Sequence, residues 1–287
     1  MTLYTYSLLS IVGINIMLAV SLNLISGFCG QVSLGHGAFF GAGAYAAALC
    51  AVAGYPVPVA LLAGLLVAGV LGVVVGFASV RLREDFLAVT TIGVGFLLVG
   101  FVRKQAWLGA EMGISKIPPS GLGPAGNAVL IVIAALATIA FSLYLSRSWM
   151  GFAFRAVADD EQAARTIAIP AATYKLVAFA IGTAIAGLAG GLYTYFTQFI
   201  VPDSFGFILS VTLMAMVVIG GNGSTWGVVV ATIILTLLPE AFRFINEYRL
   251  LIFGGLLVLV MRFAPGGLAG IVASLTAKGF AAKGRNA

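Results

Sequence analysis

The chain opens with a long stretch that holds no charged side chain, residues 1–80: MTLYTYSLLSIVGINIMLAVSLNLISGFCGQVSLGHGAFFGAGAYAAALCAVAGYPVPVALLAGLLVAGVLGVVVGFASV. The first charged residue is Arg81. A water-soluble fold of that size must present charges to solvent, whereas a charge at the centre of a bilayer costs about 2.5–3.5 kcal/mol on insertion scales. The stretch therefore predicts a polytopic membrane protein.

The composition of the whole chain agrees with this class. Hydrophobic residues make up 61% of the 287 residues and charged residues only 8%, whereas soluble domains carry about 25% charged residues. The net charge of +6 comes from Lys and Arg in loops between apolar stretches, which indicates membrane orientation rather than nucleic-acid binding. The isolated Cys29 and Cys50 predict neither a disulfide framework nor a metal site.

Apolar stretches near the bilayer-spanning length of about 20 residues recur along the chain. They predict an all-α transmembrane bundle of about nine spans, with eight to ten compatible, in a single domain over residues 1–287. The expected spans are 5–26, 36–53, 57–80, 86–102, 127–146, 175–197, 206–221, 227–243 and 249–263.

The distribution of Lys and Arg predicts the orientation. With the loop 147–175 in the cytoplasm, ten of these residues lie on the cytoplasmic side and five outside. This bias places the N-terminus outside and the C-terminus, with a basic tail over 264–287, in the cytoplasm. The N-terminus lacks the basic region of a cleavable signal.

A glycine-rich segment, SGFCGQVSLGHGAFFGAG at 26–43, interrupts the first apolar region. Close helix packing accounts for glycine pairs such as Gly37 and Gly41. Alternatively, 27–43 is a broken or re-entrant helix, which a membrane tolerates only where the backbone is buried in protein or faces water. Gln31, Ser33 and His36 then line or brace a passage. A second interruption at 220–227, which contains Asn222, echoes the first and points to a transport pathway.

The other polar residues of this region have two interpretations as well. Asn15 and Asn23 either form hydrogen bonds between helices or line a hydrophilic path. His36 is the only histidine. We favour a hydrogen-bonding role for it over a proton relay, because no intramembrane carboxylate accompanies it.

The loop 147–175 concentrates charge, with seven of the 24 charged residues of the chain. Asp159 is the expected N-cap of a short amphipathic helix at about 160–168, with Gln162 completing a variant capping box. Acidic residues at 159–161 suit the start of this helix and Arg165 suits its end. Pro170 disfavours its continuation.

The sequence also lacks several motifs. It contains no phosphate-binding loop of the form GxxxxGK[ST], no cluster of metal ligands and no convincing Ser–His pair. We therefore expect no catalytic residue, cofactor or metal, and no enzyme activity of its own.

Three groups of motifs carry a resemblance to a known family: SLNL at 21–24 with GQVSLGHGAFF at 30–40 and GAY at 43–45; MG at 150–151, FRAV at 154–157, DDE at 159–161, AAR at 163–165 and YKL at 174–176; and GGNGS at 220–224 with WG at 226–227. They resemble the LivM-type permeases, the membrane subunits of bacterial ABC importers for branched-chain amino acids. That family usually has Gly where Ala168 stands and a polar residue where Pro170 stands.

The resemblance implies an inner-membrane permease with two ABC ATPase subunits, a second LivH-type permease, a periplasmic binding protein and membrane lipid as its partners. The loop 147–175 would contact the ATPase through Arg155, Asp159, Asp160, Glu161 and Arg165. The pathway would be lined or shaped by Asn23, Gln31, Ser33, His36 and Asn222. Urea-import permeases share much of the pattern, and an ATP-independent channel, a secondary carrier or a non-transporting scaffold are further alternatives.

Overall fold

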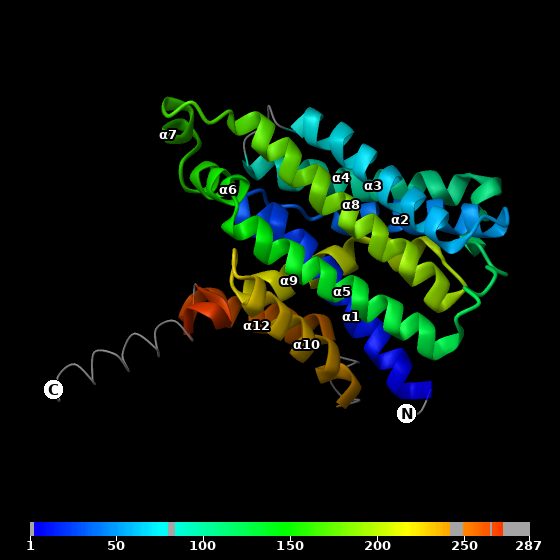
Figure 1. Ribbon diagram of the computed structural model, residues 1–287. Helices are drawn as coiled ribbons and strands as arrows, with labels where there is room; N and C mark the ends of the chain where they lie inside the picture. Colours follow the sequence, from blue (N-terminus) through cyan, green and yellow to red (C-terminus); the bar gives the residue numbers. More distant parts are fainter. Residues whose placement is uncertain (1–2, 80–83, 242–248, 265, 272–287) are drawn as a thin grey trace.

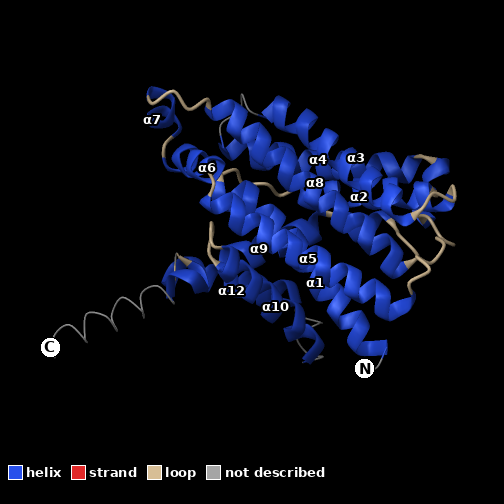
Figure 2. Cartoon of the chain, viewed as in Figure 1, coloured by secondary structure: helices blue, strands red, loops and turns tan. Residues whose placement is uncertain are grey.

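The computed structural model describes residues 3–79, 84–241, 249–264 and 266–271. Within these ranges the chain is helical, and its extended pairing is limited to one antiparallel bridge between Ile114 and Ile200 (Figure 2). The all-α prediction is therefore confirmed.

Nine described helices match the predicted spans one for one. They are α1 (Leu3–Asn23), α2 (His36–Val52), α3 (Val57–Ser79), α4 (Glu84–Lys104), α5 (Gly123–Arg147), α8 (Ala171–Thr197), α9 (Phe207–Gly220), α10 (Thr225–Ala241) and α12 (Arg249–Phe263). Seven segments are long and apolar enough to cross a membrane, whereas α2 and α10 are shorter, so the structure supports a polytopic bundle without confirming a count of nine.

The helices lie side by side in three groups (Figure 1). One group contains α2, α3 and α8 with α4 beside them, the central group contains α1 and α5, and the third contains α9, α10 and α12. Two short helices, α6 (Trp149–Asp159) and α7 (Glu161–Thr166), project at one end, which we call the α7 end. The N-terminus lies at the opposite end.

Glycines allow the closest helix contacts. A Cβ atom built on Gly43 of α2 would lie 2.3 Å from the Cα atom of Gly187 in α8, and one on Gly187 would lie 2.3 Å from the carbonyl oxygen of Gly64 in α3. No side chain fits at these points, because backbone faces backbone. The packing interpretation of the glycine pairs therefore holds for α2, α3 and α8.

The glycine-rich segment near 27–43 is a broken helix. A π-helical turn, Leu24–Phe28, ends the first span, residues 29–35 are non-helical, and α2 begins at His36. His36 Nε2 lies 2.8 Å from Ser21 Oγ on α1. Since Ser21 precedes the end of the π-turn by seven residues, α2 begins roughly 10 Å inside the bundle.

A second break lies at a place for which no break was predicted from the sequence. After α8, the segment 198–206 contains a short 3-10 helix, Pro202–Phe205, and returns into the bundle before α9 starts. A Cβ on Gly41 would lie 2.8 Å from the Phe205 side chain, and the backbone N–H of Gly37 donates to Ser210 Oγ at 2.9 Å. The two breaks therefore meet inside the bundle.

The predicted interruption at 220–227 has a different form. Residues 221–224 make the turn between α9 and α10, with Gly221 and Gly223 at positive φ angles of 106° and 81°. The counterpart of 29–35 is thus 198–206, because in both cases a long helix is followed by a non-helical return and a short helix.

Some orientation predictions fall outside the described residues. These include the basic residues Arg81, Arg83 and Arg243, and most of the tail predicted over 264–287. The structure contains no membrane, so the outside position of the N-terminus remains a prediction.

Replacing Gly43 with alanine tests the glycine packing. We expect Gly43→Ala to destabilise the protein by about 1–3 kcal/mol, because the new methyl group overlaps the backbone of α8. The measurement is the midpoint of thermal unfolding in detergent. Gly95→Ala on α4 is the matched control, since its Cβ would meet no atom within 4 Å. Equal midpoints for the two variants would contradict the packing argument.

Candidate functional site: a docking helix and a broken membrane helix

The candidate docking residues lie at the α7 end on α6 and α7. Arg155 is exposed and donates from Nη2 to the carbonyl oxygen of Ser146 at 3.0 Å. Asp159, Asp160 and Arg165 are exposed, whereas Glu161 is half-buried. The structure therefore brings the five predicted docking residues together on one projecting element of the bundle.

The candidate docking helix is α7, and its N-cap is Asp160 rather than Asp159. The Asp160 carboxylate accepts hydrogen bonds from the backbone N–H groups of Gln162 and Ala163, at 2.8 and 3.0 Å. Asp159 is instead the last residue of α6. The capping-box prediction was wrong by one residue, because the chain bends at Asp160, which has extended backbone angles.

The docking helix is shorter than predicted, at Glu161–Thr166 instead of about 160–168. It ends in a turn where Ala168 has a φ angle of +62°. Residues with a Cβ atom rarely adopt this left-handed conformation, whereas glycine adopts it readily. The turn explains physically why a glycine suits this position.

Glu161 is the centre of an ion-pair group. Its Oε1 accepts from Arg165 Nη2 at 2.6 Å, and its Oε2 accepts from Lys175 Nζ at 2.7 Å. The hydrogen bond and charge of Lys175, supported by Arg165, lower the pKa of Glu161, although partial burial opposes this shift. The side chain of Lys175 is 7% exposed, so the carboxylate of Glu161 offsets part of the cost of burying its ammonium group.

The ion pair of Lys175 with Glu161 was not predicted from the sequence, where Lys175 entered as a positive charge and as part of the YKL motif at 174–176. Lys175 stands at the predicted start of a span, and the helix in fact begins four residues earlier, at Ala171. A lysine inside the first turns of an apolar helix is a signal for a buried ion pair, and that signal was available in the sequence.

Four of the five predicted pathway residues are buried around the first break. Asn23, Gln31, Ser33 and His36 are each at most 3% exposed, whereas Asn222 is exposed in the turn between α9 and α10. In this conformation the four buried side chains brace the break from within. Asn222 is not brought together with them by any described contact.

Asn23 connects the first break to the turn 221–224. Its Oδ1 accepts from the backbone N–H of Gly223 at 3.0 Å, and a Cβ on Gly27 would lie 2.0 Å from the same oxygen. Of the two interpretations of Asn23, the observed one is a bond between helical segments. Asn15 likewise donates from Nδ2 to Thr236 Oγ1 of α10 at 3.1 Å.

Further polar groups of the break were missed by the sequence analysis. Thr91 Oγ1 of α4 accepts from the backbone N–H of Leu34 at 3.0 Å, and Ser210 Oγ of α9 accepts from the backbone N–H of Gly37 at 2.9 Å. Both residues lie in apolar helices far away in the sequence. Single hydroxyl residues are common in membrane helices, so nothing in the sequence distinguishes these two.

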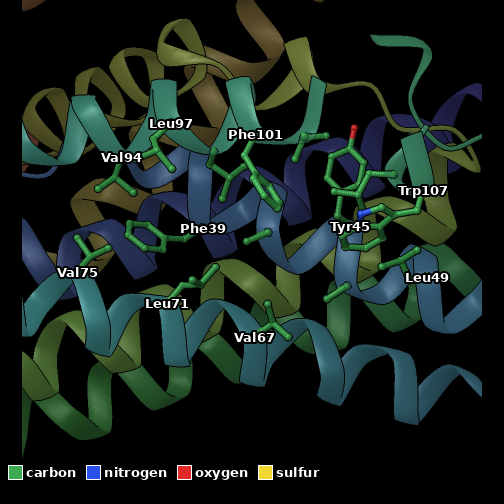
Figure 3. A pocket seen from close by; sticks show the side chains of 15 residues that line it. Phe39, Tyr45, Leu49, Val67, Leu71, Val75, Val94, Leu97, Phe101 and Trp107 are labelled. Atoms are coloured by element: carbon green, nitrogen blue, oxygen red, sulfur yellow. The ribbon is translucent and has the colours of Figure 1, made fainter. Parts of the chain in front are cut away.

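An apolar groove of about 530 Å³ lies between α2, α3 and α4 (Figure 3). Its lining includes Phe39, Leu71, Leu97 and Phe101, and also Tyr45 and Trp107. No charged residue lines this groove. A small zwitterionic solute therefore finds no group there that would hold its charges.

Removing the observed N-cap tests the position of the docking helix. We expect Asp160→Ala to cost about 1 kcal/mol of local stability, because two backbone N–H groups lose their acceptor. Hydrogen–deuterium exchange of α7 measures this loss as faster exchange. Asp159→Ala is the matched control and should leave the exchange unchanged, whereas the reverse ranking would restore the capping box predicted from the sequence.

The lowered pKa of Glu161 predicts a pH dependence. A carboxyl group whose pKa is lower in the folded than in the unfolded protein stabilises the fold fully above the unfolded pKa, and the stabilisation disappears as the pH falls through the folded value. The ordinary value is 4.5, so α7 should stay attached at neutral pH and loosen only below that value. Hydrogen exchange of α7 against pH measures this. Glu161→Gln should remove the dependence, and loosening between pH 8 and 6 would argue against the ion pair as its cause.

Comparison with known proteins places the chain. Residues 4–261 match the family model described as branched-chain amino acid transport system / permease component. The LivM permease of the high-affinity branched-chain amino acid transport system of Escherichia coli K12 is 33% identical, covering 99% of this chain and 74% of its own length.

More distant relatives cover similar shares. The BraD permease of Pseudomonas aeruginosa is 26% identical over 88% of this chain and 91% of its own length, and the LivH permease of Salmonella typhimurium is 25% identical over 88% and 90%. No solved structure matches the chain. The protein belongs to the family of permease components of branched-chain amino acid transport systems.

Proposed function

We propose that the protein is the membrane-spanning permease subunit of an ATP-driven importer for branched-chain amino acids. The observation that carries the proposal is the pairing of a polytopic bundle with one exposed, charged helix, α7, in a member of this permease family. Separate ATPase subunits hydrolyse ATP, because this sequence has no phosphate-binding loop. The permease itself catalyses no chemical reaction.

The loop 147–175 is the docking element for an ATPase subunit in this proposal. Arg155, Asp159, Asp160, Glu161 and Arg165 present charge at the α7 end, while the buried Ala164 fixes α7 to the bundle. An exposed helix with a buried anchor can receive force from a partner and pass it to the helices below. The support is this combination of exposure and anchoring.

The two breaks form the moving part of the pathway. Asn23, Gln31, Ser33 and His36 lie buried around the first break, and Asn222 is exposed in the turn 221–224. Among the described residues, Asn23 Nδ2, Ser33 Oγ and His36 Nδ1 make no hydrogen bond. Alternating access gives such groups a partner when the pathway opens to water and solute.

The complete importer contains two ABC ATPase subunits, this chain, a second permease of the LivH type and a periplasmic binding protein. Its site is the bacterial inner membrane, with the N-terminus outside and the loop 147–175 and the C-terminus in the cytoplasm. Lipid surrounds the bundle, and nucleic acid is not a partner. The binding protein selects the substrate, since the permease offers a path rather than a deep binding pocket.

Reconstitution tests the proposal. We expect proteoliposomes that hold this chain, its partner permease and both ATPases to take up leucine only with binding protein and ATP, because the chain has no energy source of its own. The measurement is uptake of labelled leucine, with excess isoleucine or urea as competitor. Competition by isoleucine and not by urea is the expected result.

The control is the chain reconstituted alone. ATP-independent leucine flux in that sample would instead identify a channel or secondary carrier, and displacement of leucine by urea would identify a urea or short-amide permease. Absence of flux in every sample would argue for a scaffold.

A further inference from the structure

We infer that Lys175 and Gln31 couple the docking helix to the broken membrane helix, so that displacement of α7 repositions segment 29–35. This inference rests on the proposed function and assigns to both residues a positioning role. Their role is to transmit a movement from the surface to the break.

The first step of the link runs from α7 to α8. Lys175 Nζ donates to Glu161 Oε2 at 2.7 Å, and the lysine side chain is only 7% exposed. A short, charge-assisted hydrogen bond at a largely buried group is costly to break, whereas an exposed ion pair separates easily. A movement of α7 therefore pulls on Lys175 through Glu161.

The second step runs from α8 to the break. Gln31 Nε2 donates to the backbone carbonyl oxygen of Lys175 at 2.9 Å, and Gln31 is 3% exposed. Lys175 is thus held at both ends, by its side chain to the docking helix and by its carbonyl group to segment 29–35. The docking helix and segment 29–35 are therefore connected through Lys175 by two hydrogen bonds.

A small apolar cluster moves with this polar link. It is separate from the main core, and we call it the docking cluster: Leu24, Phe28, Cys29, Leu145, Phe154, Val157, Ala164, Ala171 and Ala178. It joins the π-helical turn to α6, α7 and the start of α8. A Cβ on Gly30 would lie 3.2 Å from the Cβ atom of Ala158, so segment 29–35 also packs directly on α6.

The π-helical turn gives the break room to move. Leu24–Phe28 carries one residue more per turn than an α-helix, and such turns occur frequently at functional sites. Leu24 and Phe28 of the π-helical turn belong to the docking cluster and Ile25 to the main core, whereas Asn23, just before this turn, accepts from the backbone N–H of Gly223 between α9 and α10. Displacement of the cluster is therefore absorbed between residues 24 and 35.

The test uses the full importer in proteoliposomes and measures leucine transported per ATP hydrolysed. We expect Lys175→Met to lower this ratio at least about five-fold, because coupling between sites typically corresponds to factors of about 5–150. Lys175→Arg keeps the charge and should stay within about two-fold of the wild type. Thr173→Ala is the matched control, because Thr173 lies two residues before Lys175 on α8 and its side chain is exposed. This variant should leave the ratio unchanged.

A second measurement separates coupling from mere support of the loop. Ser33→Cys, in a background with Cys29→Ala and Cys50→Ala, places a thiol in the break. We expect its labelling rate to change between the nucleotide-free and nucleotide-trapped importer when Lys175 is present, and to stay constant with Lys175→Met. A purely structural role of Lys175 would not abolish this nucleotide dependence.

Gln31→Met covers the case in which Lys175→Met does not assemble. It removes the donor to the Lys175 carbonyl and leaves both residues of the Glu161–Lys175 pair unchanged, so we expect assembled importer that hydrolyses ATP with a lowered transport ratio. Normal ratios and normal labelling changes in the assembled variant would overturn the inference. Failure of the wild type to transport with ATP would instead overturn the proposed function.

Discussion

Every non-helical backbone group inside this bundle needs a hydrogen-bonding partner supplied by the protein, because lipid offers none. The first break satisfies this constraint with side chains from distant helices. Thr91 Oγ1 accepts a hydrogen bond from the backbone N–H of Leu34, and Ser210 Oγ accepts one from Gly37 at the start of α2. Asn23 Oδ1 likewise accepts from the backbone N–H of Gly223 in the turn 221–224. Glycines in the break let these partners approach the backbone. The arrangement of α1, α2, α4, α9 and the turn 221–224 depends on these hydrogen bonds.

The same constraint bears on the position of α6 and α7 beside segment 29–35. Segment 29–35 begins at the α7 end, beside α6 and the start of α8. An unbroken helix keeps its own hydrogen bonds and resists local deformation, whereas an extended segment held by a few side chains can exchange partners at small cost. A force on α7 reaches the part of the membrane domain that yields most easily.

The sequence predicted the class of fold and its spans well, because an apolar run of spanning length has few other structures. It also predicted the break at 27–43, since closely spaced glycines together with Gln31, Ser33 and His36 are unusual at membrane depth. It placed the N-cap at Asp159 instead of Asp160, because adjacent carboxylates differ only in backbone angles. Thr91, Ser210 and the break at 198–206 were not predictable, since their roles arise from contacts between residues far apart along the chain.

The two breaks also divide the bundle into units of opposite direction. The unit of α1, 29–35 and α2 starts at the N-terminal end, and the unit of α8, 198–206 and α9 starts at the α7 end. Each break is covered by the other, with Phe205 against Gly41 and Ser210 against Gly37. Movement of one break removes a partner from the other, so the two rearrange together. The contacts to α6 and to Lys175 of α8 are made by the first break, so in the proposed importer a movement of α7 would reach the second break through the first.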